Sequence, residues 1–417
     1  MDNPPTQGEK LSMGFLDRLF GAPTMDKVAR DMTRELQALG AEDVQAHVDR
    51  GELKFRLHGS PRSMFLANLL HDLQRTPRAG RAAVMQRFLA GVSAAEAIPQ
   101  RYDGARASLM PVVRARADIG LAALAVASSV DAADARDRQA FRPLVGELVV
   151  ALVFDTPSSM AYVNEETLER WQVDFDQALA DALHNLRGLP EHGGWKSMGD
   201  GVWSGEWGDS YDSSRLLLPD LIHRTGVRDP VVVAPFRNAL MVTAGDNVAG
   251  IARMGQAIED ALEDNPRWLS FELLRLDGTR WTPHAPLVAA DAWHRLRLRN
   301  AASADEQQKR LLDALHERQN IDLWVASSQM IARDDLGTLG FSVWSNGVDT
   351  LLPRTEFLLF NPDNEDASTR LLVPWADAVE IVGTLMEPTG YVPERVRVRR
   401  FPDASQLSRL RERSLAL

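Results

Sequence analysis

The first part of the chain combines helical and alternating hydrophobic patterns. Over residues 26–39 apolar side chains recur every three or four positions, which predicts an amphipathic helix. Residues 52–57, ELKFRL, alternate between apolar and polar side chains and predict a half-buried strand. Ser60 and Pro61 are residue types favoured at a helix N-cap and at the first helical position, so we expect a helix to begin there. Together these patterns predict a helix-rich N-terminal region over residues 26–138.

The middle of the chain has longer apolar runs. The β-branched run at 144–154 predicts a buried strand. Asn164 is placed to cap a long helix over 164–189. Residues 229–246 predict two strands around a turn, and a helical pattern follows them. We interpret residues 139–285 as an α+β core.

A segment of weak periodicity, residues 284–293, separates this core from the last part of the chain, and we place a domain boundary there. Residues 304–319 predict a helix, and the residues after it predict a group of strands with one further helix. Strands and helices occur in groups, without regular alternation of one strand and one helix, which is typical of α+β folds. We therefore predict a C-terminal α+β domain over 292–417.

Two segments of similar sequence raise the alternative of an internal duplication. GVWSGEWGDSYDSSRLLLP at 201–219 and FSVWSNGVDTLLP at 341–353 share Val-Trp-Ser, a glycine, an aspartate and Leu-Leu-Pro. Each is followed by an apolar strand pair and a helical pattern. One interpretation is that the two α+β domains are a degenerate duplication. The polar motif GDSYDSSRLLLPDLI at 208–222 itself predicts a turn and a helix start that frame the sheet.

The first 25 residues form a separate leader. MGFLDRLFG at 13–21 places Phe15, Leu16, Leu19 and Phe20 on one face of a short amphipathic helix. Such a helix is too short for stable membrane anchoring and lacks the basic polar face of an interfacial helix. We expect it to dock on its own protein.

Composition narrows the functional classes. The chain has 417 residues, which is long for one hydrophobic core, so we expect several domains. The absence of cysteine excludes disulfides and thiolate chemistry and fits a reducing compartment. The net charge of −11 disfavours general nucleic-acid binding. No apolar run is long enough to span a membrane, and the opening residues lack the features of a secretion signal. We therefore expect a cytoplasmic protein.

Several separated motifs resemble the YtpQ-like family of bacterial proteins, a family of unknown function. The motifs, in chain order, are LMPVVRAR (109–116), GELVVALVFDTPSSMAYVNEETLERW (146–171), ALHNL (182–186), GDSYDSSRLLLPDLI (208–222) and DPVVVAPFRNALMVTAGD (229–246). The resemblance covers about residues 105–283. It implies a soluble bacterial protein, and it supplies no reaction and no site residues. The residues after about 290 lie outside it.

Candidate chemistry is limited to a group of charged residues. The chain has no serine-hydrolase nucleophile motif, no HExxH zinc motif and no phosphate-binding loop motif, so we predict no catalytic residue, metal site or cofactor. Charged residues at strand ends and turns are the candidates for ligand or partner binding: Asp155, Asp212, Arg215, Arg237 and Asp246. In the structural alternative, Arg215 and Arg237 pair with Asp212 and Asp246 and tie the turns together.

The segment RVRVRR at 395–400 alternates in charge. Its pattern places Arg395, Arg397 and Arg399 on one face of a strand. One interpretation is an edge strand whose charges prevent aggregation. The other is a basic strip for an acidic partner or nucleic acid, although no aromatic residues interleave with the arginines.

The leading functional hypothesis is a non-enzymatic cytoplasmic protein that binds another protein, as an adaptor or a chaperone-like module. The alternative is a hydrolase or a small-ligand-binding protein that uses the Asp/Arg cluster around residues 212–246. Nucleic-acid binding through the arginine strip is a weaker third hypothesis. The sequence does not predict an oligomeric state.

Overall fold

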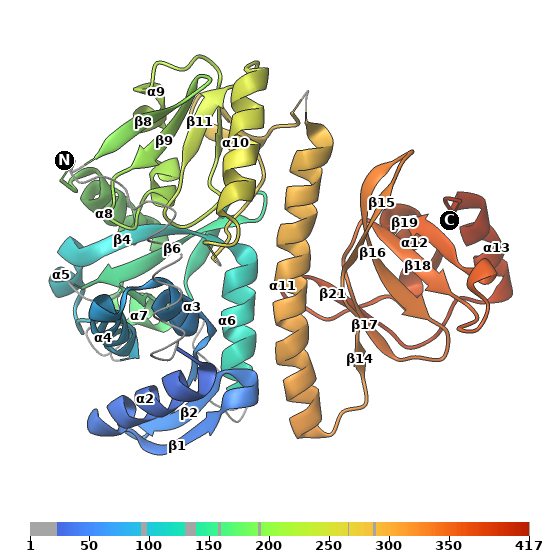
Figure 1. The fold of residues 1–417 in the computed structure, drawn as a ribbon, viewed down its shortest axis with the longest axis horizontal. Helices are drawn as coiled ribbons and strands as arrows, with labels where there is room; N and C mark the ends of the chain where they lie inside the picture. Colours follow the sequence, from blue (N-terminus) through green and yellow to red (C-terminus); the bar gives the residue numbers. More distant parts are fainter. Residues whose placement is uncertain are drawn as a thin grey trace. The chain divides into compact units, whose positions relative to one another are not determined.

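The computed structural model of the chain describes residues 23–92, 98–129, 139–156, 160–190, 193–265, 267–286 and 289–416. The predicted leader and its amphipathic helix lie almost wholly outside these residues. The fold is α+β, as predicted, with several sheets and flanking helices (Figure 1). The described residues divide into two units, the first within 1–99, 129–134 and 155–161, and the second within 100–128, 135–154 and 162–417.

The first unit contains an antiparallel sheet in the order β1-β2-β3, covered by helices. Its core contains fully buried residues such as Met32, Leu36, Leu53 and Leu69. The elements in chain order are α2 (Met25–Ala38), β1 (Glu42–His47), β2 (Glu52–Leu57), β3 (Ser60–Phe65), α3 (Ala67–Arg75) and α4 (Arg81–Val92). The predicted helix over 26–39 and the predicted strand over 52–57 are confirmed.

The prediction that a helix begins at Ser60 is wrong, because Ser60–Phe65 forms strand β3. His58 and Gly59 both have positive φ, 49° and 79°, so they form a tight turn that folds the chain back against β2. Pro61 lies in an edge strand, where its missing N–H is tolerated. The helix begins only after Leu66.

The second unit begins with a sheet in the order β4-β6-β5, whose central strand is the predicted buried run. Gly146, with φ of 52°, forms the turn that separates β5 from β6. Helix α8 packs on β4, every residue of which is buried. The elements are α5 (Tyr102–Ala105), β4 (Leu109–Ala115), α6 (Arg116–Ser129), β5 (Phe141–Val145), β6 (Leu148–Asp155), β7 (Met160–Tyr162), α7 (Glu165–Trp171) and α8 (Phe175–Arg187).

The predicted continuous helix over 164–189 is divided in two. Asn164 caps α7 by accepting from the Thr167 N–H at 2.8 Å, as expected. Gln172 then adopts a left-handed conformation with φ of 56°, and Asp174 caps α8. The break lets both short helices bury an apolar face.

An antiparallel sheet in the order β13-β12-β10-β11-β9-β8 follows. The predicted strand pair within 229–246 is confirmed as β10 and β11. The elements are β8 (Gly194–Gly199), β9 (Val202–Glu206), α9 (Pro219–His223), β10 (Pro230–Val233), β11 (Met241–Ala244), α10 (Val248–Ala261), β12 (Leu274–Asp277) and β13 (Arg280–Pro283). The motif at 208–222 forms a turn, the 3-10 helix η5 (Ser213–Leu217) and α9, as predicted.

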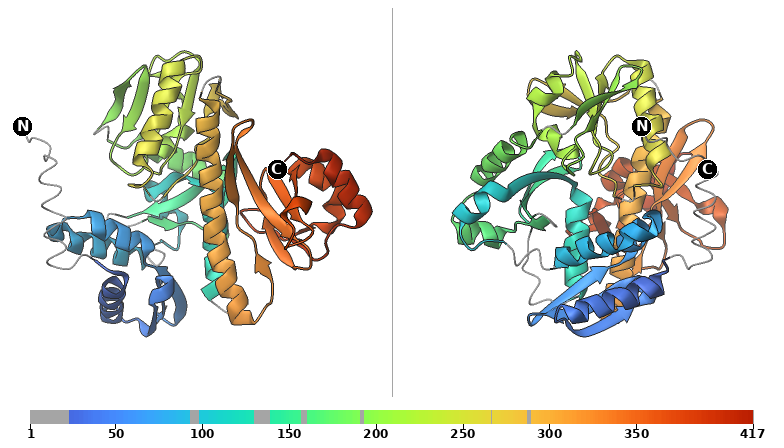
Figure 2. Two further views of the ribbon diagram at one scale, coloured as in Figure 1. Left: turned by 45° about the vertical axis from the view of Figure 1, so that its right-hand side comes forward. Right: turned by 60° about the vertical axis from the view of Figure 1, so that its left-hand side comes forward.

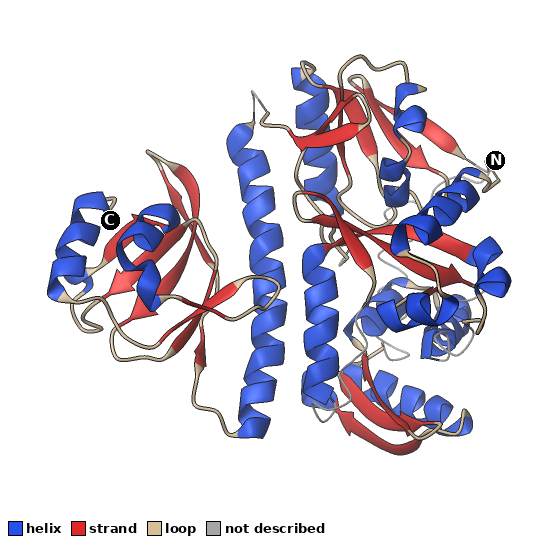
Figure 3. Ribbon diagram, turned by 180° about the vertical axis from the view of Figure 1, so that it is seen from behind, coloured by secondary structure: helices blue, strands red, loops and turns tan. Residues whose placement is uncertain are grey.

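Helix α11 (Ala290–Gln319) starts inside the segment where we placed the domain boundary and has 30 residues, more than the predicted 304–319. Its first turns bury Trp293 and Leu296 in the core of the preceding sheet and α10. Further along, Leu312 packs with Leu124 of α6. Helices α6 and α11 lie side by side (Figures 1 and 3). The helix is thus shared by the middle and the last part of the second unit.

The last part of the second unit has two sheets, in the orders β14-β17-β21-β20 and β15-β16-β18-β19. Helices α12 and α13 lie against these strands and share their core (Figure 2). The elements are β14 (Trp324–Val325), β15 (Gln329–Arg333), β16 (Gly337–Ser345), β17 (Thr350–Pro353), β18 (Phe357–Asn361), β19 (Leu371–Pro374), α12 (Trp375–Val382), β20 (Glu387–Pro388), β21 (Arg395–Val398) and α13 (Ala404–Arg413).

Strand order does not support the predicted duplication. The first Leu-Leu-Pro segment forms the 3-10 helix η5 and the start of α9, whereas the second forms strand β17. In addition, β9 pairs antiparallel with β11, the second strand of the next hairpin. The strand at the corresponding place, β16, pairs parallel with β18, the first strand of the next hairpin.

The predicted basic strip at 395–400 is also wrong. Strand β21 is not an edge strand, because it pairs with β17 on one side and with β20 on the other. Arg395 has no exposed surface, while Arg397 pairs with Asp349 at 2.6 Å and Arg399 pairs with Glu387 at 3.1 Å. These arginines are therefore used within the fold.

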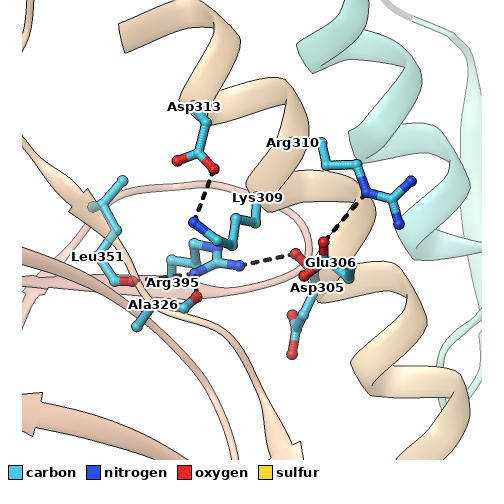
Figure 4. A network of polar contacts seen from close by, with 8 residues as sticks. All are labelled: Asp305, Glu306, Lys309, Arg310, Asp313, Ala326, Leu351 and Arg395. Atoms are coloured by element: carbon cyan, nitrogen blue, oxygen red, sulfur yellow. Dashed lines mark hydrogen bonds and ion pairs between the residues drawn. The ribbon is translucent and has the colours of Figure 1, made fainter. Parts of the chain in front are cut away.

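Arg395 joins α11 to the strands of the adjacent sheet (Figure 4). Its guanidinium donates to the main-chain oxygens of Ala326 at 2.7 Å, Leu351 at 3.1 Å and Asp305 at 3.0 Å, and to the side chain of Gln308 at 2.5 Å. Burial lowers its pKa, and the nearby carboxylate of Asp305 opposes that shift. A charged group in this position is stable only because every side of it meets an acceptor.

Replacing Arg395 by methionine should lower the free energy of unfolding by about 3 kcal/mol or more, since it leaves buried oxygens without donors. Arg399→Met is the matched control, because the Arg399–Glu387 pair is half exposed and should contribute about 0.5 kcal/mol. Urea unfolding followed by tryptophan fluorescence measures both variants. Equal losses would contradict the role given to Arg395.

Candidate functional site

The predicted polar motif folds into a compact turn built around Arg215. This side chain is 4% exposed, and its terminal nitrogens donate to the two carboxylate oxygens of Asp209 at 2.9 and 2.5 Å. Its guanidinium carbon also lies over the Trp207 ring, 4.3 Å from the ring centre. A bidentate ion pair covered by an aromatic ring fixes the arginine in one orientation.

Asp212 has a different partner from the one predicted. Its carboxylate accepts the Trp207 backbone N–H at 2.9 Å, and it is almost completely buried. Burial raises the pKa of Asp212, and the Trp207 hydrogen bond opposes that shift. At Asp209 burial also opposes ionisation, but the hydrogen bonds from Arg215 and the Tyr211 N–H outweigh it and lower the pKa. The expected Arg215–Asp212 pair is therefore wrong, and Asp209 in the same motif takes that place.

Arg237, in the turn between β10 and β11, pairs with Asp118 of α6 at 2.9 Å. The expected pair with Asp246 is wrong, because Asp246 lies exposed in the turn after β11. Asp155 lies half-buried at the end of β6. The carboxylate that meets Arg237 is 119 residues away in the sequence, so no local pattern could identify it.

The structure nevertheless brings two of the predicted segments together. The backbone N–H and the hydroxyl of Ser213 both donate to the main-chain oxygen of Arg237, at 3.4 and 2.8 Å. The hydroxyl of the next residue, Ser214, accepts the N–H of Val113 at 3.3 Å. Helix η5 therefore fixes the ends of β4 and β10 relative to each other.

The Asp209–Arg215 pair predicts that lysine cannot replace arginine here. Arg215→Lys should lower the free energy of unfolding by about 2 kcal/mol, because an ammonium group cannot make the bidentate contact and stack on Trp207 at once. Arg275→Lys is the control, since the Arg275–Asp229 pair at 2.5 Å is about half exposed and should change stability by about 0.5 kcal/mol or less. Urea unfolding compares the two, and a larger loss in the control would contradict the prediction.

Two further polar groups escaped the sequence analysis, and the first is centred on Arg114. This residue is the last but one of β4 and is 6% exposed. It donates from Nε to the Tyr162 hydroxyl at 2.7 Å and from Nη1 to the Val113 oxygen at 2.8 Å. Its motif RAR was visible in the sequence as part of LMPVVRAR. The partner tyrosine could not be inferred, because it lies 48 residues further along the chain.

The second group is centred on Asp305 of α11, which is 4% exposed (Figure 4). Its carboxylate accepts a hydrogen bond from the Ser328 hydroxyl. Burial raises the pKa of Asp305 to about 6, while Ser328 and the charge of Arg395 oppose the shift. The sequence pattern does not predict that Asp305 is buried, because the neighbouring residues of the helix are charged and predict a solvent-exposed face.

Asp305 should make stability depend on pH. Its folded pKa of about 6 lies above the value near ~4 expected in an unfolded chain, so the folded state holds a proton that the unfolded state loses. The stabilisation is complete below pH ~4 and is lost as the pH rises to about 6, by about 3 kcal/mol. Asp305→Asn cannot ionise, and urea unfolding at a series of pH values should show that this decline is absent.

The control for Asp305→Asn is Asp313→Asn on the same helix, whose half-exposed carboxylate pairs with Lys309 at 2.8 Å. That variant should keep the decline between pH ~4 and 6. An unchanged decline in Asp305→Asn would show that another group causes it.

A third candidate is the free face of the sheet β15-β16-β18-β19. Register places Ile331, Phe341, Leu359 and Leu372 on the same face, opposite the face that packs on α12 and α13. These residues line a hollow of about 550 Å³ together with the β15–β16 turn. The hollow is mainly apolar, with Arg333 and Asp335 the charged pair beside it, 2.9 Å apart.

The two edges of this sheet differ. Strand β19 is covered by the chain itself, because Leu415 forms a β-bridge with Leu372 and donates to its oxygen at 2.8 Å. At the other edge β15 pairs with β16 alone within the described residues. Met330 and Ile331 of β15 are 45% and 42% exposed, on opposite faces of the strand. An apolar edge strand of this kind is available for pairing with another strand.

Comparisons with known proteins add no assignment. No protein-family model, no curated protein and no solved structure matches the chain. In the part of the chain that the structure describes, no three His, Asp or Glu side chains are grouped so that they could hold a metal ion. No helix of that part is long and apolar enough to cross a lipid bilayer.

Proposed function

We propose that this protein binds an extended segment of another protein, which adds as a strand to the free edge at β15 and places side chains in the adjacent hollow. The observation that carries the proposal is the exposed apolar pair Met330 and Ile331 on an edge strand that has one neighbour in the described sheet. Strand addition of this type uses main-chain hydrogen bonds for affinity and side-chain pockets for specificity.

The character of the edge supports binding. Natural sheets protect their edges with proline, inward-pointing charges, bulges or very short strands. Strand β15 has five residues, contains no proline and pairs with β16 in unbroken register. Arg333, the one charged residue of β15, is engaged by Asp335. The edge thus lacks the features that would prevent strand addition.

The neighbouring groups indicate what the occupant looks like. A segment on β15 would alternate apolar side chains so that one set enters the hollow beside Ile331 and Phe341. Asp334 and Asp335 are exposed at the turn of the hairpin, and Arg333 balances one of them. The remaining negative charge favours a segment with a basic residue at the end near this turn.

The Asp/Arg cluster supports the enzymatic alternative less well. Arg215 is held by Asp209, Asp212 accepts the Trp207 N–H, and Arg237 pairs with Asp118. These contacts fix turns of the scaffold. The weaker nucleic-acid hypothesis rested on the strip at 395–400, whose Arg395 is buried and whose Arg397 and Arg399 have acidic partners. The resemblance to the YtpQ-like family and the cytoplasmic location remain proposals that fit a protein-binding module.

Selection of short random peptides on the immobilised full chain tests the proposal. The selected peptides should alternate in hydrophobicity, and fluorescence anisotropy should show that Ile331→Asp and Met330→Asp each weaken their affinity by about tenfold or more. Val379→Asp is the matched control, because Val379 is 44% exposed on α12, outside this edge. It should leave the affinity unchanged.

Backbone methylation of the selected peptide separates strand addition from binding in the hollow alone. Methyl groups on alternate amides should abolish binding when they remove the hydrogen bonds to β15 and have little effect at the intervening positions. Peptides that bind Ile331→Asp as tightly as the unmodified chain would overturn the proposal.

A further inference from the structure

A second, independent binding site follows from the charge around Arg114. Its guanidinium is almost wholly buried, yet among the described residues no carboxylate lies within salt-bridge distance of it. Its contacts are the Tyr162 hydroxyl and ring and the adjacent Val113 oxygen. A buried cation without a counter-ion is costly, and proteins normally pair such a group or bring an anion to it.

A second cation makes the imbalance larger. Burial lowers the pKa of Arg114 and the positive charge of Arg237 lowers it further, while Tyr162 and the carboxylate of Asp118 oppose the shift. The two arginines lie on either side of η5, because Ser214 accepts the N–H of Val113 and Ser213 donates to the main-chain oxygen of Arg237. Asp118 pairs with Arg237 and is the carboxylate that the described residues supply to the two arginines. The group Arg114, Arg237 and Asp118 therefore keeps one positive charge that its own carboxylate does not balance.

Hydrogen-bond donors without acceptors in this group also indicate a site for an anion. The Nε of Arg237 is buried and meets no hydrogen-bond acceptor in the part of the chain that the structure describes. The Tyr162 hydroxyl accepts from Arg114, and no acceptor for its own proton is found among the described residues. Since buried donors are almost always satisfied, the Nε of Arg237 indicates a missing acceptor, and the hydroxyl of the half-buried Tyr162 is a second available donor. The side chains of Arg237 and Asp118 are about one-third exposed, so a small solute can reach the group.

The backbone on both sides of the group is held in place. Ser214 accepts the N–H of Val113, the residue before Arg114, and Ser213 donates to the main-chain oxygen of Arg237. Both serines belong to η5, so one short helix sets the separation of the two arginines. Donors that are fixed before binding lose little freedom when a ligand arrives.

We propose that Arg114, Arg237 and the Tyr162 hydroxyl bind the oxyanion of a small molecule, a phosphate or a carboxylate group. The planar guanidinium fork suits both types of oxyanion. The Tyr162 proton would complete the set of donors. This site is separate from β15 and does not depend on the function proposed for that edge.

Isothermal titration of the full chain with inorganic phosphate and with acetate, at constant ionic strength set by chloride, tests the site. Arg237→Gln should weaken anion binding by about tenfold or more, and Tyr162→Phe by a smaller factor. Arg142→Gln is the control: Arg142 is an arginine of the same unit that lies over the Phe175 ring, and its loss should leave anion affinity unchanged. Thermal denaturation provides a second measurement. The rise in the unfolding midpoint on adding the anion should be largest for the unmodified chain and Arg142→Gln, smaller for Tyr162→Phe and smallest for Arg237→Gln.

The outcomes separate the two anions and can overturn the site. Binding of phosphate alone assigns a phosphate-bearing ligand, and binding of acetate alone assigns a carboxylate-bearing ligand. Binding of both anions assigns a site that accepts either group. Failure of both anions to bind beyond chloride would refute the proposal. Equal binding by the unmodified chain and by both Arg237→Gln and Tyr162→Phe would also refute it. The test does not substitute Arg114, because this residue is buried and its replacement is expected to unfold the protein.

Discussion

Burial of the Arg395 guanidinium is the constraint on which the second unit depends. A charge removed from water must be surrounded by acceptors, and here they come from α11, from the end of β14 and from β17. Because these elements are far apart in the sequence, the requirement couples their positions. Helix α11 also buries Trp293 in the core of the middle sheet. One helix, held near its start by Trp293 and at its middle by Asp305 and Gln308, therefore relates the middle sheet to the last two sheets.

The same principle explains how this chain uses its arginines. Where a carboxylate pairs with the arginine, as Asp209 does with Arg215, the result is a rigid turn. Where main-chain oxygens take the place of a carboxylate, as for Arg395, the result is a link between elements. Where the partners are fewer than the donors, as around Arg114 and Arg237, the protein retains a capacity to bind. The number of available acceptors distinguishes the three cases.

Local patterns predicted the elements whose stability is local. The strand pair within 229–246, the cap at Asn164 and the turn and helix start at 208–222 appear as expected. The helix start predicted at Ser60 and Pro61 is wrong, because the two-residue turn at His58 and Gly59 folds the chain back into a hairpin. The exposed basic strip predicted over 395–400 is wrong, because an alternating pattern shows which residues share a face of a strand and does not show whether that face is buried. The partner of Arg237 lies 119 residues away in the sequence, and the partners of Arg395 lie 44 to 90 residues away, so only the fold reveals them.

The bridge between Leu415 and Leu372 has a consequence for how copies of the chain could assemble. It closes one side of a sheet whose other side is open, so a sheet partner can join in one direction only. If Ser414–Ala416 were cleaved or displaced, the sheet would offer two unlike edges. Unlike edges join head to tail, and such contacts generate open filaments when no rotation closes them into a ring. Three residues near the end of the described chain thus separate capture of a single ligand strand from polymerisation.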